Sequence, residues 1–82
     1  MYQIKGKIAS NNADDFEKNI MAVMPKEIDA SELTYILIAG LRVLMKLRKT
    51  VGNVTINNVT SEVYEIFEVT GFTQLMTVNK KL

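Results

Sequence analysis

The stretch DASELTYILIAGLRVL, residues 29–44, decides the fold of this 82-residue chain. It starts on a strand that we expect to be brief, around Glu27 to Asp29, and passes through a tight apolar connection. A helix is then expected to open at Ala39-Gly40 and to run to about Lys49, because its apolar residues recur at helical spacing. The residues of the predicted core-facing side are Leu41, Leu44 and Met45, with Val43 and Leu47 broadening the apolar arc.

The N-terminal part of the chain predicts one strand and one helix. From Tyr2 to Ile8, apolar residues alternate with polar ones, which is typical of a strand with one solvated face. After the helix-start cluster Ser10-Asn11-Asn12, apolar residues follow helical spacing up to Pro25, which ends the helix. The residues expected to face the core are Ala13, Phe16, Ile20, Val23 and Met24.

The last predicted helix has recognisable signals at both ends. Thr60 suits its N-cap, because a side-chain oxygen there can accept a hydrogen bond from the first turn. Gly71 suits the left-handed position just after the helix end, and Phe72 would then fold back onto Phe67.

Two further strands are expected, at residues 54–59 and at Leu75–Val78. In the first of these, Val54, Ile56 and Asn58 share a face. Strands and helices therefore alternate along the chain, which favours parallel pairing with right-handed crossovers. Since the strands alternate between apolar and polar residues, one face of the sheet should meet solvent. The predicted fold is α/β, with two layers: a four-stranded, mostly parallel sheet with helices on one face, in a single domain over residues 1–82.

The composition excludes several classes of function. Cysteine and histidine are both absent, which removes Cys–His and Ser–His catalysis and the usual zinc ligand sets. The net charge is +1, which gives no general attraction to nucleic acid or to an anionic membrane. No apolar run approaches the roughly 18 residues of a membrane span. We expect no enzyme activity, no catalytic, cofactor-binding or metal site, and no nucleic-acid or membrane partner. The absence of cysteine fits a cytoplasmic protein.

Some local features admit both a functional and a structural interpretation. Gly40 at a helix start would offer N–H groups to an anion, but local chemistry favours a tight strand-to-helix junction. Arg42, Lys46 and Lys49 recur on one helix face and would suit an acidic partner. A solvated face is the simpler interpretation, because no aromatic residue is interleaved. The same interpretation applies to the acidic stripe of the last helix, Glu62, Glu65 and Glu68.

Residues 29–47 resemble the central motif of STAS domains, the fold of anti-sigma factor antagonists. Tyr35, Ile36 and Gly40 match the family pattern well. The segment NNVTSEV, residues 57–63, and the later TGF, residues 70–72, are similar to the family's C-terminal signature. The resemblance covers nearly the whole chain, which starts at what looks like the family's second strand. It implies a non-enzymatic module that binds an anti-sigma factor kinase and so frees a sigma factor.

The chain departs from the family pattern at the switch. Leu37 and Ile38 stand where the resemblance expects a polar residue and then the Ser that the kinase phosphorylates. Isoleucine offers no oxygen nucleophile, so the phospho-switch does not carry over. The nearby hydroxyls of Ser31 and Thr34 are expected to serve turns. At least one of the two aliphatic residues should be exposed, because the matching Ser must be reachable by a kinase, and such a patch would favour weak homodimers.

Three hypotheses remain open at this point. The first is a partner-binding module of STAS type, for which the resemblance implies these contact residues: Tyr35, Leu37, Ile38, Ala39, Gly40 and Arg42. The second is an engineered or degenerate STAS-fold domain that has lost partner-switching activity. The third is an enzyme or nucleotide-binding protein, which the absence of a phosphate-loop pattern opposes.

Overall fold

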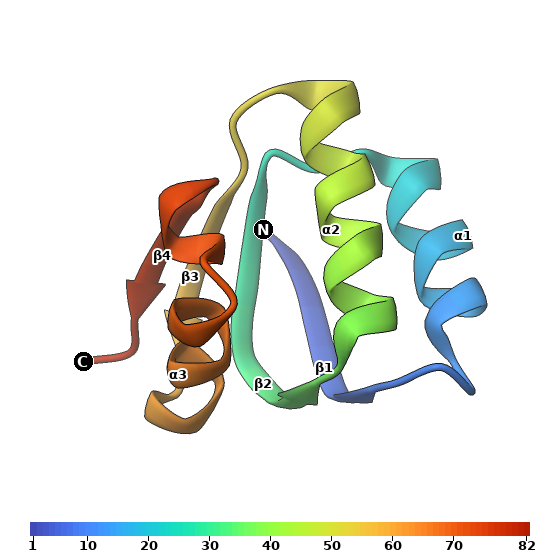
Figure 1. The fold of residues 1–82 in the computed structure, drawn as a ribbon. Helices are drawn as coiled ribbons and strands as arrows, with labels where there is room; N and C mark the ends of the chain where they lie inside the picture. Colours follow the sequence, from blue (N-terminus) through green and yellow to red (C-terminus); the bar gives the residue numbers. More distant parts are fainter.

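Four strands and three α-helices alternate along the chain in the computed structural model, which describes residues 1–82 (Figure 1). The strands are β1 (Tyr2–Ile8), β2 (Glu27–Ile36), β3 (Thr55–Val59) and β4 (Thr77–Lys80). The helices are α1 (Ala13–Val23), α2 (Ile38–Val51), α3 (Ser61–Val69) and a short 3-10 helix, η1 (Phe72–Gln74).

The strands form one sheet in which neighbours in sequence are also neighbours in space. Their order is β1-β2-β3-β4, and all the pairings are parallel. Each pair is joined by a helix, and right-handed crossovers between successive strands place every helix on the same face. Figure 1 shows α1, α2 and α3 on that face. The predicted two-layer α/β fold is therefore confirmed, with a sheet that is parallel throughout.

The core lies between the sheet and the helices and is entirely apolar. Eighteen buried apolar residues form one cluster, and no polar side chain is buried. The rings of Phe67 and Phe72 lie 6.2 Å apart, centroid to centroid. Gly71, with a φ of 82°, makes the left-handed turn between them, so the predicted end of α3 is confirmed.

β2 is longer than predicted, because two register shifts break the alternation by which a strand is recognised in the sequence. It continues to Ile36, well beyond the expected end at Asp29. Against β1, its register shifts between Asp29 and Glu32 and again between Leu33 and Tyr35. Each shift adds a residue to β2, so its inward-facing side chains do not keep a spacing of two. The buried residues of the strand are Ile28, Ala30, Leu33 and Ile36.

A similar shift in β3 reverses the predicted face of Asn58. This residue has a φ of 60°, in the left-handed region where asparagine is enriched. The register against β4 shifts between Ile56 and Val59. As a result Val59 is fully buried and Asn58 is exposed. The predicted grouping of Asn58 with Val54 and Ile56 is wrong, because the shift puts Val59 on their buried face instead.

α1 buries a narrower stripe than its apolar spacing suggests. It lies at the margin of the helix layer, beside α2 (Figure 1). Ala13 and Ile20 are buried, but Val23 and Met24 are 59% and 46% exposed. The helix ends before Pro25 as predicted, and Met24 takes a left-handed conformation with a φ of 50°. The prediction that Val23 and Met24 face the core is wrong.

Other element boundaries differ slightly from the predicted ones. Asn12 precedes α1, but its side chain bonds the Ala9 N–H and the Lys7 carbonyl, each at 2.8 Å, instead of capping the helix. Thr60 occupies the N-cap of α3 without a side-chain capping bond. The last strand starts at Thr77 rather than Leu75, because η1 takes up the chain after Gly71.

The face of the sheet opposite the helices carries a polar network around Asp29. Its carboxylate accepts hydrogen bonds from Asn58 Nδ2 at 2.9 Å and from the Ser31 hydroxyl and N–H at 3.0 and 3.2 Å. These bonds hold the pKa of Asp29 below its ordinary value, and the bond from Asn58 makes the largest contribution. Glu32 accepts a bond from Gln3 Nε2 at 2.8 Å. Ser31 is thus engaged within its own strand.

Candidate partner-binding site

The predicted site residues gather where β2 passes into α2. Leu37 alone separates the two elements. Its N–H donates to the Ile8 carbonyl at the end of β1, at 2.9 Å. Its own carbonyl accepts the N–H groups of Gly40 and Leu41, at 2.9 and 3.0 Å. The start of α2 is therefore fixed to the ends of both strands, and the Gly40 N–H is not available to an anion.

Gly40 is buried beneath this turn. A Cβ atom at this position would lie 2.7 Å from Ile8 Cγ2 and 2.8 Å from Ile36 Cγ1. Both distances are well inside the optimal separation of non-bonded carbon atoms, about 3.5–4.0 Å. The structural interpretation of Gly40, a tight strand-to-helix junction, is therefore confirmed. Gly40 positions the residues around it and presents no side chain to a partner.

Three apolar side chains are exposed around the turn. The exposed fraction is 45% for Tyr35, 37% for Leu37 and 66% for Ile38. Ala39 is half-buried. The expectation that at least one of Leu37 and Ile38 is exposed is confirmed. Leu37 and Ile38 are consecutive and Tyr35 precedes them by two residues, so three large exposed apolar side chains lie close together in the chain at this turn.

A pocket of about 400 Å³ adjoins Ile38, between α2 and the segment that follows α3. Its α2 wall consists of Ile38, Leu41, Arg42 and Met45, and its other wall of Thr70 and Phe72. Sequence reasoning missed the second wall, because it depends on how α3 packs onto the sheet. The TGF motif at residues 70–72 was the only available signal, and it indicated a helix end rather than a pocket.

Arg42 is the basic side chain of α2 that lines this pocket. Lys46 forms an ion pair with Glu17 of α1 at 2.6 Å, and Arg48 Nε donates to the Leu75 carbonyl. Arg42 has no ion pair or side-chain hydrogen bond within the chain. Of the three basic residues on this face of α2, Lys46 is therefore paired with α1, whereas Arg42 and Lys49 make no ion pair within the chain.

Outside this site, the molecule has one further pocket and no cluster of metal-ligating side chains. A pocket of about 240 Å³ lies between β1 and α1 and contains none of the predicted site residues. No group of three or more His, Cys, Asp or Glu residues is placed to hold a metal ion. No helix reaches both the length and the apolar character needed to cross a bilayer.

A family model for the STAS domain matches residues 1–82, in agreement with the parallel sheet and its single helical layer. The chain belongs to the STAS domain family. STAS domains are generally non-enzymatic regulatory modules, and they commonly work in anti-sigma factor antagonism and related regulation. No curated protein shows a significant sequence match to this chain.

This STAS domain has two exposed aliphatic residues, Leu37 and Ile38, where β2 passes into α2. Ile38 is the first residue of α2 and is largely exposed. Its side chain offers methyl groups and no hydroxyl at the surface.

Proposed function

We propose that this STAS domain is a regulatory module that binds an anti-sigma factor of the serine-kinase type, and that it lacks a phosphorylation switch at position 38. The proposed contact surface is the start of α2 and its surroundings: Tyr35, Leu37, Ile38, Ala39, Gly40 and Arg42. Gly40 positions this surface, and the other five residues would contact the partner. A partner of this kind also implies a bacterial, cytoplasmic setting.

The exposure of Ile38 is the observation that carries this proposal. A side chain that is 66% exposed at the first turn of a helix is not held there by core packing. It lies beside a pocket whose walls are mostly apolar and which includes Arg42. Apolar contact area with an arginine nearby is typical of protein–protein interfaces.

The missing hydroxyl determines how the proposed complex would behave. A phosphoserine adds close to two negative charges, which disrupts an interface that was built without them. No phosphate can be attached to an isoleucine side chain. The proposed complex is therefore constitutive, and addition of ATP should not dissociate it.

The aliphatic pair at positions 37 and 38 also favours one rival, an engineered or degenerate STAS domain without partner-switching activity. Under that hypothesis the fold is kept while the docking surface has lost its function. The two hypotheses differ in one result, which is whether any anti-sigma factor kinase binds at all.

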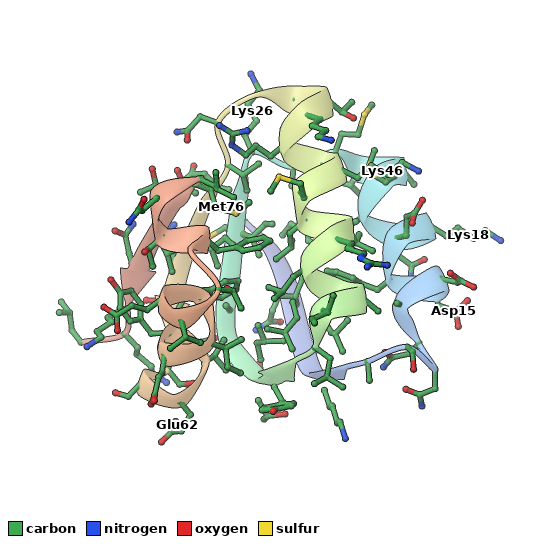
Figure 2. All side chains as sticks on the ribbon, in the orientation of Figure 1. Asp15, Lys18, Lys26, Lys46, Glu62 and Met76 are labelled. Carbon is green, nitrogen blue, oxygen red and sulfur yellow. The ribbon has the colours of Figure 1, made fainter.

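Pull-down of a panel of anti-sigma factor kinases by the immobilised domain separates these hypotheses. We expect at least one kinase to be retained by the wild type and lost with Arg42→Glu. Lys26→Glu is the matched control, because Lys26 lies at the opposite end of the sheet (Figure 2). Retention of no kinase would favour the degenerate domain, and equal retention by both variants would place the interface elsewhere.

Phosphosite mapping after incubation with the retained kinase and ATP tests the missing switch. The wild type should carry no phosphate, whereas Ile38→Ser should be labelled at position 38. Stoichiometric phosphate on Ser31 or Thr34 of the wild type would show that the acceptor had been misplaced.

A further inference from the structure

We infer that the pocket between α2 and the segment after α3 binds a small amphipathic carboxylate, that is, a monoanion with an aliphatic body such as a medium-chain fatty acid. The side chains that line the pocket carry this inference, without any partner protein. Only its consequence for partner binding rests on the proposed function.

The pocket has the size of a small-molecule site and a partly rigid apolar lining. Its volume of about 400 Å³ lies in the range of about 300–1,000 Å³ that is usual for ligand pockets. Two of its lining residues, Leu41 and Phe72, are only 4% and 8% exposed and belong to the apolar core. Met45 is half-buried and packs against that core, and its unbranched thioether side chain can adapt to the outline of a ligand. An apolar body entering here would therefore meet fixed core residues together with one adaptable side chain.

Arg42 is the only charged side chain that lines the pocket. It is exposed and makes no ion pair within the chain. Thr70, the other polar residue of the lining, donates its hydroxyl proton to the Ile66 carbonyl at 2.7 Å. The hydroxyl of Thr70 is thus engaged at the end of its own helix, and the guanidinium of Arg42 remains as the one free side-chain donor.

A carboxylate with an apolar body is the ligand chemistry that matches this lining. A guanidinium presents N–H donors in a planar fork, which fits the two oxygens of a carboxylate. No second cation lines the pocket, so a single negative charge is matched and a multiply charged anion is not. An uncharged apolar ligand would leave Arg42 without a counter-ion, and a cationic ligand would be repelled by it.

The small size of such a ligand limits its affinity. At the binding free energy per atom that is usual for small ligands, octanoate should have a dissociation constant of about 0.1–5 mM. Burial of each methylene group should raise the affinity by up to about 4-fold. Hexanoate, which is two methylene groups shorter, should therefore bind about 10-fold more weakly than octanoate.

Under the proposed function, a bound carboxylate would control partner docking. Ile38 and Arg42 belong both to the pocket and to the proposed contact surface, so a ligand beside them competes with the kinase. A small molecule would then release the domain from its partner at a helix start where the Ile38 side chain cannot accept phosphate.

Titration of the isotope-labelled domain with octanoate, followed by two-dimensional NMR, tests the binding without any partner. The Met45 methyl group and the backbone amides around Ile38 and Thr70 should shift saturably. Octanol has the same aliphatic body without the charge and should bind about 10-fold more weakly. Octylamine, which is protonated at neutral pH, should not bind.

Arg42→Gln provides the sharper test, because it should act on only one of these ligands. It should weaken octanoate binding by about 10-fold and leave octanol binding unchanged. Lys49→Gln is the matched control, because it removes the same charge from the same helix at a residue that makes no ion pair and lies outside the pocket. It should leave the binding of both ligands unchanged. Circular dichroism should show native folding for both variants.

Absence of saturable shifts at the pocket would overturn the inference, and so would equal affinities for octanoate and octanol. Equal effects of Arg42→Gln and Lys49→Gln on octanoate binding would overturn it too. Each of these results leaves the proposed function intact, since retention of a kinase is measured separately. A kinase complex that persists at saturating octanoate would overturn the competition alone.

Discussion

Two residues show how local contacts set the geometry around the site. Gly40 lets the first turn of α2 lie directly against Ile8 and Ile36. Leu37 ties that turn to the end of β1 through its backbone N–H. Together these contacts leave Ile38 at the surface. The sequence predicted that at least one of Leu37 and Ile38 would be exposed, but not which one.

Substitution of Gly40 by alanine tests this contact, because the contact decides whether the free energy of unfolding rises or falls. Helix propensity alone would make alanine the more stable residue by about 1 kcal/mol. The contacts of a Cβ atom with Ile8 and Ile36 oppose this, and overpacking of a core costs about 1–3 kcal/mol. We expect Gly40→Ala to lower the free energy of unfolding in urea. Stabilisation would show that the junction is looser than described.

Asp29 makes the stability depend on acidic pH. Its pKa is lowered in the folded state, chiefly by the hydrogen bond from Asn58. A lowered pKa means that its stabilising contribution is present above the ordinary aspartate range and is lost as the pH falls through the folded value. The wild type should therefore have a higher urea midpoint than Asp29→Asn at pH 7. This difference should shrink as the pH falls below the ordinary aspartate value of about 4. A constant difference at all pH values would contradict this.

Whole elements were predictable where their periodicity was unbroken. α2 keeps regular apolar spacing, and the predicted residues Leu41, Val43, Leu44 and Leu47 are buried. β2 does not, because two extra residues opposite β1 break the period of two that identifies a strand. The left-handed backbone at Asn58 does the same in β3. Such shifts are decided by pairing with the neighbouring strand, which a single segment of sequence does not contain.

The end of α1 offers a stabilising substitution. Met24 has a φ of 50° and is almost half exposed. A left-handed conformation costs a non-glycine residue about 1–2 kcal/mol, and glycine is the preferred residue at this position. We expect Met24→Gly to stabilise the domain by about 0.5–1 kcal/mol in urea unfolding, since some packing is lost.

Val23→Gly is the matched control for that substitution. Val23 is the preceding residue, it is also exposed, and it is the last residue of the helix. Glycine there should destabilise by about 0.5–1 kcal/mol. Equal effects of the two substitutions would show that the backbone of Met24 is not strained.

For the whole molecule, strand–helix alternation was enough to predict two layers and a parallel sheet. Topology rules then leave few alternatives for so short a chain. The α2 half of the candidate site could be predicted for the same reason, because it is contiguous in sequence. The wall formed by Thr70 and Phe72 could not, since it reaches Ile38 only through the packing of α3.

Calorimetric titration of the retained kinase into the domain, with and without ATP, tests the central claim most directly. The claim is that the start of α2 binds the partner and that position 38 cannot release it. The wild type should bind with the same affinity in both conditions, whereas ATP should weaken binding of Ile38→Ser by at least about 10-fold. A comparable ATP-dependent loss of affinity in the wild type would contradict the claim.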